Sequence, residues 1–400
     1  MKVLVVCQFY YPEQFRITDV CEELVSRGHD VTVITGLPNY PQGKVLGEYK
    51  HGKKRDEVIN GVKVHRCFEI GRRKNILFRV LNYYSFALSA KRYAKKLKEQ
   101  FDVVLVNQLS PVMMAYAGMA YKKKHGKKLA MYVMDLWPTS LAAGGIKDSS
   151  FIYKHFKKVS KKVYDSADEI LITSNQFAPY MQNELGVDGQ KIKYLPQYAE
   201  NFFRDKDCEK VDDGYIDLVF AGNIGWAQSV ETILWAAYKT LDIDNLRYHI
   251  VGDGSALEDC KQFAKEKNLS NVIFHGMKKL EEMPVYYKMA DAMLVTLVAD
   301  ENLSRTLPGK VQSYMAAGKP IIGAANGETE QILKMAGCGY CGAAEDADAL
   351  AANVRQIVKD KLDGKLADMG AKSRVFYDNN FKREQFFINL ENALERNRAK

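Results

Sequence analysis

A lysine near the start of a predicted helix is the strongest chemical signal in this sequence. In the stretch Leu307–Ile322, Pro308 and Gly309 are typical of a helix start, and Gly318 is typical of its end. Lys310 then lies in the first helical turn, where the helix dipole disfavours a positive charge. The sequence therefore predicts that an anion lies between Lys310 and the free amides of this helix start.

A glycine-containing loop, 220–228, is a second candidate anion site. It joins a predicted strand to a predicted helix over 229–240, and Gly222 and Gly225 permit close approach to the backbone. The free amides at the helix start can hold a diphosphate. Neither this loop nor Gly252-Asp-Gly254 completes a G-x-G-x-x-G fingerprint, and the sequence has no P-loop. These absences disfavour dehydrogenases and P-loop NTPases.

Two further strand-to-helix loops are open to two interpretations each. The loop Gln8–Arg16 follows the first predicted strand, at the sheet edge where ligands bind in doubly wound folds, but it also fits an ordinary turn. Arg16 has the forked guanidinium that suits phosphate oxygens. In Gly252–Ser255, the serine fits a helix N-cap as well as a ligand contact.

The sequence predicts no metal site. Cys338-Gly-Tyr-Cys341 has no second cysteine or histidine pair, so a turn and a buried strand fit it better, and the seven histidines are dispersed. Seven cysteines, an odd number, suit a reducing cytoplasm. The apolar run Val3–Cys7 is too short for the core of an export signal. We therefore expect a cytoplasmic protein.

These candidate loops need a scaffold, and short β-branched runs alternate with helical patterns in the manner of parallel sheets covered by helices. The alternation occurs twice, on either side of the polar segment 197–214. The sequence therefore predicts an α/β protein with domains over 1–200 and 201–380, and a final helix, Arg383–Arg398, that can leave the second domain. The predicted strands are Lys2–Cys7, Asp30–Thr35, Val62–Cys67, Asp102–Val106, Leu129–Met134, Glu169–Thr173, Ile216–Ala221, Arg247–Val251, Val272–His275, Ala292–Leu297 and Lys319–Gly323.

Charge is distributed unevenly between the two predicted domains. With 400 residues and 47% apolar content the chain fits a folded globular protein, and its net charge is +9. Residues 1–200 carry 32 basic and 19 acidic side chains, whereas 201–400 carry 26 and 30. Basic residues gather on Ile76–Lys98, Lys122–Lys128 and Phe151–Tyr164. These faces fit either solvated surfaces or an anionic partner, and a membrane surface fits better than a nucleic acid, since no nucleic-acid-binding module is present.

Five motifs follow one another along nearly the whole chain: Arg27-Gly-His-x-Val-x-Val-Ile-Thr35, Gly222-Asn-x-Gly225, Ile250-Val-Gly-Asp-Gly254, the segment from Phe274-x-Gly276 to Ala290-Asp291, and Tyr314-Met-Ala-Ala-Gly-Lys-Pro-Ile-Ile322. In this order and spacing they resemble the retaining glycosyltransferases of family 4. Within that family, the loops Phe15–Asp19, Leu37–Pro41 and Asp135–Pro138 are similar to enzymes of bacterial surface-polysaccharide assembly, including N-acetylfucosamine transferases.

The resemblance implies the GT-B fold, in which two Rossmann-like domains face each other across a cleft and the last helix returns to the first domain. It implies that a nucleotide-sugar donor binds mainly to the second domain and the acceptor to the first. It also implies that neither a metal nor a cofactor is required, because helix amides and basic side chains stabilise the departing diphosphate.

The family's functional residues transfer unevenly to this sequence. Many members carry an Arg and a Lys on the diphosphate where this chain has Asn223 and Gln228, and two glutamates where it has Arg305 and Ser313. Lys310, with Arg16 or Arg305, would then supply the positive charge. The implied catalytic residues are Lys310, Asp135 and Arg305; the implied donor-binding residues are Gly222, Asn223, Gly225, Gln228, Gly252, Asp253, Met277, Gly309 and Ser313; and the implied acceptor or cleft residues are Pro12, Glu13, Phe15, Arg16 and Tyr40.

The resemblance therefore predicts a glycosyltransferase that moves a sugar from a UDP-linked donor to a lipid-linked saccharide at the inner face of a bacterial membrane. The expected partners are the nucleotide sugar, the lipid-linked acceptor and an anionic membrane surface, with no nucleic acid. Two alternatives remain open: a nucleotide-sugar 2-epimerase of the same fold, and a sugar-nucleotide-binding subunit without catalysis.

Overall fold

The computed structural model describes residues 1–40, 42–72, 76–144, 146–205, 210 and 213–396. The chain forms two compact units. The first comprises residues 1–173, 177–195 and 387–400, and the second comprises 174–176 and 196–386. The sequence predicted that the first domain ends at residue 200 and that the second ends at residue 380, before the final helix.

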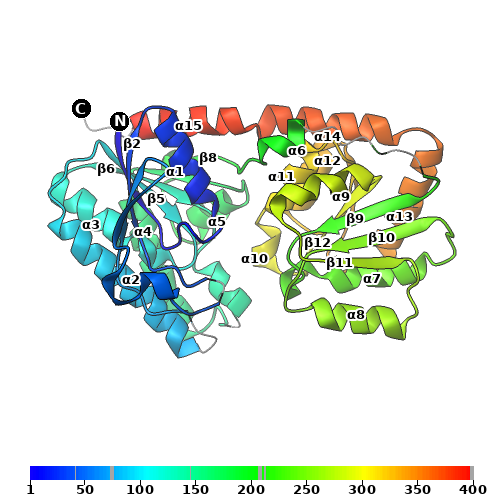
Figure 1. Cartoon of the computed structure of the whole chain (residues 1–400), viewed down its shortest axis with the longest axis horizontal. Helices are drawn as coiled ribbons and strands as arrows, with labels where there is room; N and C mark the ends of the chain where they lie inside the picture. The colour runs from blue at the N-terminus through cyan, green and yellow to red at the C-terminus, as the bar shows by residue number, and fades with distance from the viewer. Residues whose placement is uncertain (41, 73–75, 145, 206–209, 211–212, 397–400) are drawn as a thin grey trace. The chain divides into compact units, whose positions relative to one another are not determined.

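In the first unit, the described strands form an eight-stranded sheet in the order β3-β4-β2-β1-β5-β6-β7-β8 (Figure 1). Every pair is parallel except β3 and β4, which are antiparallel. The strands are β1 (Lys2–Val6), β2 (Asp30–Thr35), β3 (Asp56–Ile59), β4 (Val62–Arg66), β5 (Val103–Gln108), β6 (Lys128–Val133), β7 (Glu169–Ile172) and β8 (Ile192–Tyr194).

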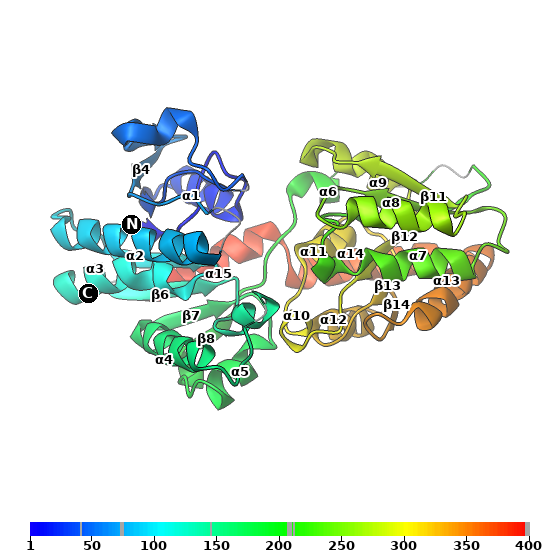
Figure 2. The ribbon, with the colours of Figure 1, turned by 90° about the horizontal axis from the view of Figure 1, so that it is seen from below.

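Helices cover both faces of this sheet because successive strand residues point to opposite sides. Leu4 and Val6 of β1 face a core formed with α2 (Ile76–Lys96), α3 (Tyr116–His125), α4 (Phe151–Ser166) and α5 (Phe177–Asn183). Figure 2 shows α2 and α3 in front of the sheet, with α15 (Arg383–Arg396) behind it. Val3 and Val5 alternate with that pair, and α1 (Arg16–Ser26) packs along β2 and β4.

The second unit repeats the principle with six described strands, all parallel, in the order β11-β10-β9-β12-β13-β14. Its strands are β9 (Ile216–Ala221), β10 (Leu246–Val251), β11 (Val272–Gly276), β12 (Ala292–Thr296), β13 (Ile321–Ala324) and β14 (Gly339–Gly342). Its helices are α6 (Asn201–Asp205), α7 (Val230–Lys239), α8 (Leu257–Glu266), α9 (Met283–Met289), α10 (Glu301–Ser304), α11 (Gly309–Ala316), α12 (Glu328–Ala336), α13 (Ala347–Leu362) and α14 (Leu366–Asn380).

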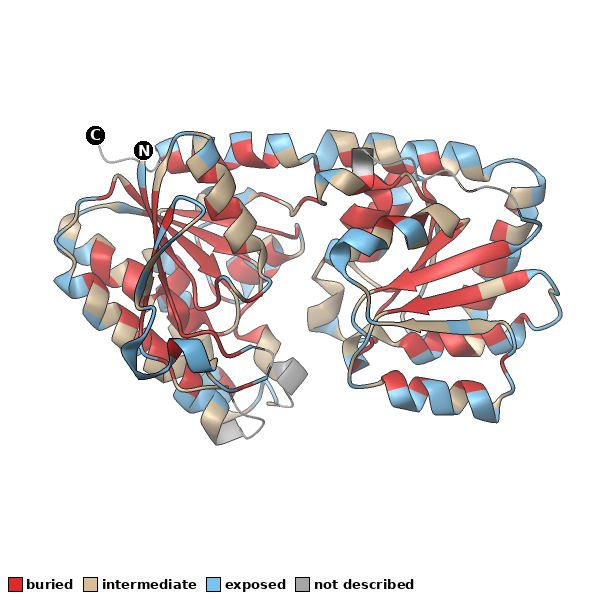
Figure 3. Cartoon of the chain, viewed as in Figure 1, coloured by how far each residue is buried: buried red, intermediate tan, exposed pale blue. Residues whose placement is uncertain are grey.

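Strand β9 shows how this sheet divides two cores. Leu218 and Phe220 face the side covered by α7, α8 and α13, whereas Val219 and Ala221 face the side covered by α9, α11 and α14. All four side chains are buried, as are most of the sheet residues in both units (Figure 3). The central strands are therefore buried and largely apolar, which explains why the sequence predicted them.

Several predicted bounds differ from the structure. The edge strands β3 and β8 and the short helix α6 were not predicted. Ser255 is not a helix cap, because α8 begins at Leu257 and Ala256 stands at its N-cap. The polar run 378–380, before the predicted final helix, is the last part of α14, which continues to Asn380.

Helix α15 (Arg383–Arg396) carries the chain from the second unit back into the first. Within the first unit, Glu391 of α15 accepts hydrogen bonds from Arg27, at 3.3 Å, and lies 2.9 Å from Nε2 of His29. Arg27 also lies over the ring of Phe387. The Arg27-Gly-His29 motif therefore anchors the end of the chain.

Candidate functional site

Lys310 lies in the first turn of α11, and its side-chain nitrogen sits in an apolar niche. Nζ is 3.7 Å from the centre of the Phe220 ring, and a Cβ built on Gly222 would come within 2.9 Å of it. Other atoms of the residue reach solvent, but Nζ itself is buried, and among the described residues it has no hydrogen-bond or ion-pair partner. Lys310 therefore lies against the Gly222 loop, so the two anion sites that the sequence predicted separately adjoin each other.

Burial without a partner disfavours the charged form of an amine. It lowers the pKa of Lys310 from 10.5 to about 7. The helix dipole adds a second unfavourable effect, because its positive end lies at the start of α11, next to the ammonium group. Both effects would be relieved by an anion bound against this side chain.

Tyr314 fixes the position of this lysine. It lies one helical turn after Lys310, and its hydroxyl accepts a hydrogen bond from the backbone N–H of Ala221 and donates one to the carbonyl of the same residue, both at 3.0 Å. These two bonds tie α11 to the end of β9. The start of α11 is thus held beside the loop that follows β9.

Two glycine loops pack against each other at this sheet edge. A Cβ on Gly252 would lie 1.8 Å from the carbonyl oxygen of Gly222, and one on Gly254 would lie 2.3 Å from that of Ile224. The N–H of Ile224 donates to the carbonyl of Asp253 at 2.9 Å. Gly252 and Asp253 therefore support the Gly222 loop through their backbones, and their contact with a donor stays a prediction.

Of the other predicted donor residues, three are open to solvent and two pack against neighbouring groups. Asn223 is exposed, Gly309 opens α11 in open space, and Met277 is 79% exposed after β11. The carbonyl of Gln228 accepts from the hydroxyl of Thr296, and the side-chain oxygen of Gln228 is buried with no partner among the described residues. A Cβ on Gly225 would come within 2.6 Å of the Asn223 amide nitrogen.

Arg305 and Ser313 are engaged locally. The guanidinium of Arg305 pairs with Glu301 and donates to the side chain of Asn302 at 3.2 Å. The hydroxyl of Ser313 donates to the carbonyl of Gly309 at 3.4 Å. Lys310 therefore differs from Arg305, because Arg305 has an acidic partner within its own unit.

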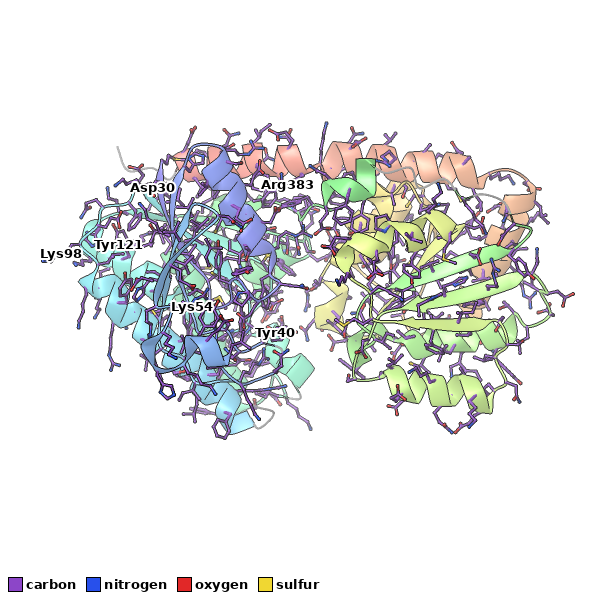
Figure 4. All side chains as sticks on the ribbon, in the orientation of Figure 1. Asp30, Tyr40, Lys54, Lys98, Tyr121 and Arg383 are labelled. Carbon is purple, nitrogen blue, oxygen red and sulfur yellow. The ribbon has the colours of Figure 1, made fainter. Side chains whose placement is uncertain are left out.

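In the first unit, Glu13 joins two loops at the carboxyl edge of the sheet. Its buried carboxylate accepts hydrogen bonds from the backbone N–H groups of Asn39, at 2.8 Å, and Tyr40, at 2.6 Å. Phe15 stacks on Phe9, with ring centres 4.9 Å apart, and contacts Tyr40. Tyr40 is about half exposed (48%), and Figure 4 shows it on the side of this unit remote from Lys98 and Tyr121.

The remaining first-unit candidates lie along the same sheet edge. Asp135 follows β6 and accepts a hydrogen bond from the backbone N–H of Ser110 at 3.0 Å; burial raises its pKa. Arg16 opens α1, and its charge opposes the rise that burial causes in the pKa of Tyr132. Pro12 lies in the loop between β1 and α1.

Glu69 is a buried residue just after the carboxyl end of β4, and it was not among the predicted site residues. One of its carboxyl oxygens accepts from Gln8, at 2.7 Å, from Asn39, at 3.3 Å, and from Asn82. The other oxygen lies against Gly36, where a Cβ would come within 1.7 Å. The available signal was a lone carboxylate in the apolar run after β4.

Two properties of the described residues bear on possible partners. They contain no group of three or more His, Cys, Asp or Glu side chains placed to hold a metal ion. In the same part of the chain, no helix combines the length and the apolar content that crossing a bilayer requires.

Both halves of the chain match models of known protein families. Residues 15–197 match the Glycosyltransferase Family 4 model, and residues 202–376 match the Glycosyl transferases group 1 model. The chain is 25% identical over 382 residues to WcaI of Escherichia coli (strain K12), described as a colanic acid biosynthesis glycosyl transferase, with 89% of this chain and 92% of WcaI covered.

Two solved structures share the fold at low sequence identity. Sucrose-phosphate synthase from Thermosynechococcus elongatus aligns with a TM-score of 0.77 at 16% identity, covering 99% of this chain and 98% of that one. Anabaena HepE in complex with UDP-glucose aligns with a TM-score of 0.70 at 13% identity, covering 99% of both chains. With a family 4 domain in its first half and a group 1 domain in its second, the chain belongs to the glycosyltransferases of the GT-B fold.

Proposed function

We propose that this glycosyltransferase is retaining and metal-independent, and that it moves an N-acetylated sugar from a UDP-linked donor to a lipid-linked saccharide in bacterial surface-polysaccharide assembly. The site at the start of α11 carries the proposal for the donor. It offers one buried, unpartnered lysine nitrogen among the described residues, beside a glycine with no side chain. A diphosphate fits these groups, since it supplies negative charge where the helix dipole and the lysine both favour it.

The comparisons support the donor and the pathway. HepE, which shares the fold, has been solved with UDP-glucose, and WcaI is described by its part in colanic acid biosynthesis. We place the acceptor on the first unit, as the family resemblance implies, at the sheet edge where Tyr40, Glu13 and Asp135 lie.

The proposed chemistry needs no covalent intermediate. The acceptor hydroxyl attacks the anomeric carbon from the face that the diphosphate leaves, the carbon–phosphate-oxygen bond breaks, and the departing phosphate oxygen takes the hydroxyl proton. Lys310 and the first amides of α11 stabilise the negative charge that develops on the diphosphate. Asp135 orients the acceptor hydroxyl.

We also propose that the first unit binds anionic membranes through α4. Lys154, Lys158 and Lys162 lie at helical spacing on one face of α4, and all three are exposed without an ion pair among the described residues. Phe151 and Ile152 are exposed at the start of the same helix. Basic residues beside exposed apolar side chains are typical of peripheral membrane contacts.

A two-stage assay tests the proposed reaction. A thermal-shift screen of nucleotide sugars should give the largest stabilisation with a UDP-sugar, about 2.7 kcal/mol at 100 times its dissociation constant. Release of free UDP should then require a polyprenyl-linked glycan extract, with the donor's anomeric configuration retained in the product by NMR. UDP release from donor alone, with a changed sugar, would indicate a 2-epimerase; binding without any UDP release would indicate a non-catalytic subunit.

Metal independence has its own test. Turnover should be unchanged in excess EDTA, because the proposed site stabilises the leaving group with a lysine and helix amides. Loss of turnover that a divalent ion restores would contradict the proposed site chemistry.

A further inference from the structure

The niche around Lys310 provides no counter-charge. Phe220 presents its ring to Nζ at 3.7 Å, Gly222 presents backbone, and Tyr314 on the same helix uses its hydroxyl on Ala221. Ionisable side chains on the surrounding elements are engaged elsewhere: Glu231 of α7 accepts from Trp235, Asp253 accepts from the N–H of Gly254, Asp300 caps α10, and Glu301 pairs with Arg305.

An ammonium in such a niche faces only the Phe220 ring and lacks water, a hydrogen-bond acceptor and a carboxylate among the described residues, which is costly unless the group gives up its proton. Burial alone lowers the pKa of Lys310 to about 7, so in the free protein the amine is mostly neutral above that pH. An anion held against Nζ favours the charged form instead. The two states of the site therefore differ in protonation as well as in occupancy.

We infer that binding of the donor diphosphate brings a proton onto Lys310, so that this residue becomes a cation only when its anionic partner is in place. The inference rests on the proposed function, because it takes the donor site to be at the start of α11. A site of this kind selects against neutral sugars, which cannot stabilise the charge. It also supplies the leaving group with a cation that water does not screen.

Isothermal titration calorimetry of the full chain with UDP at pH 8.5, in Tris and in bicine, tests the inference. At this pH the terminal phosphate of UDP, with a pKa of about 6, is fully ionised and contributes no proton. The two buffers have different ionisation enthalpies, so the difference in heat reports protons taken up. We expect uptake of about one proton per UDP, and a dissociation constant that rises about sevenfold between pH 7.5 and 8.5.

Variants assign the proton to its site. Lys310→Arg keeps a cation that stays charged at every working pH, so UDP should bind it with the same heat in both buffers and no change in affinity between pH 7.5 and 8.5. Lys334→Arg, at an exposed position of α12, is the matched control and should behave as the wild type. For the wild type, NMR of lysine labelled with ¹³C should show Lys310 titrating near pH 7 without UDP and no longer doing so with it.

The outcomes separate the inference from the proposed function. UDP binding with equal heats in both buffers, or uptake that persists in Lys310→Arg, overturns the inference and leaves the donor site standing. A wild-type protein that binds no UDP at any pH overturns both. An NMR titration of Lys310 near its ordinary range, above pH 10, overturns the inference even where a variant fails to fold.

Discussion

At the scale of single residues, Lys310 lowers the free energy of unfolding of the free protein, and the proposed diphosphate would offset this cost when it binds. Because burial disfavours its charged form, the folded state loses free energy relative to the unfolded state as pH falls from about 10.5 to 7, and the loss is constant below that. Lys310→Met should therefore raise the free energy of unfolding by about 4 kcal/mol at pH 7.5. The same variant should lower turnover by roughly 100 to 1,000-fold, as removal of one preorganised charge-stabilising group does.

Paired measurements of melting temperature and turnover on Lys310→Met check this trade-off. Lys319→Met is the contrasting variant, because Lys319 is buried with its Nζ donating to the carbonyls of Lys288 and Ala290. It should lose stability and keep its donor affinity. A Lys310→Met protein that melts lower than the wild type would contradict the account of an unpartnered lysine.

Glu69 gives the opposite pH dependence in the first unit. Burial raises its pKa to about 8, although Gln8, Asn82 and Asn39 donate to it. Between about pH 5 and 8 the unfolded chain ionises this group while the folded chain does not, so stability falls as pH rises. Glu69→Gln keeps an acceptor oxygen and should abolish that slope, whereas Glu69→Ala leaves three donors without an acceptor and should cost about 2 to 4 kcal/mol. Melting temperatures at pH 6.0 and 7.5 distinguish the variants; an unchanged slope in Glu69→Gln would refute the assignment.

At the scale of elements, the sequence predicted what local pattern determines. The central strands are largely apolar, and the helix α11 has both a proline-glycine start and a glycine end. The edge strands β3 and β8 were missed, because one alternates weakly on an exposed hairpin and the other has three residues.

The candidate site could be predicted only where a residue is unfavourable in the helix or strand that contains it. Lys310 conflicts with the dipole of its helix, and so it could be found from the sequence. The niche formed by Phe220 and the tether from Tyr314 depend on a strand 90 residues away in sequence, which no local pattern encodes. The packing of Gly252 on Gly222 is a tertiary contact of the same kind.

A buried charge cluster at the other end of β9 holds β9 and β10 together. Asp217 accepts from Arg247, at 2.6 Å, from His249, at 2.8 Å, and from Lys210, at 2.6 Å. Burial raises the pKa of Asp217, but these three donors outweigh it and hold the pKa well below its usual range. The stability that Asp217 contributes is therefore present above about pH 4 and lost as pH falls further.

Asp217→Asn should cost about 3 kcal/mol, since it removes the buried carboxylate that Arg247 and Lys210 share and leaves them only Asp213 and Asp291. Asp213→Asn is the matched control: Asp213 also pairs with Arg247 but is half exposed, so its loss should cost much less than that of Asp217. Urea unfolding at pH 7 measures both. Equal costs in the two variants would mean that the cluster is not the source of stability.

At the scale of the whole molecule, the excess of basic residues in the first half predicts salt-dependent binding to anionic vesicles. Each lysine near such a surface contributes about 1 kcal/mol, so replacing Lys154, Lys158 and Lys162 with Gln should weaken binding roughly 100-fold at low ionic strength. Co-sedimentation with vesicles of phosphatidylglycerol and phosphatidylcholine measures the effect. Lys265→Gln with Lys334→Gln, in the second unit, should leave binding unchanged; equal binding to purely neutral vesicles would count against the basic surface.

The return of the chain through α15 also affects the order in which the protein can be completed during synthesis. The first unit includes residues 387–400, so the ribosome makes the whole of 196–386 before the segment that Arg27 and His29 hold becomes available. At about 5 to 20 residues per second, that interval lasts on the order of 10 to 40 seconds. Throughout it, the surface that Phe387 and Leu390 later cover must remain exposed or be shielded by a chaperone. The first unit is thus the first to be synthesised and the last to complete its fold.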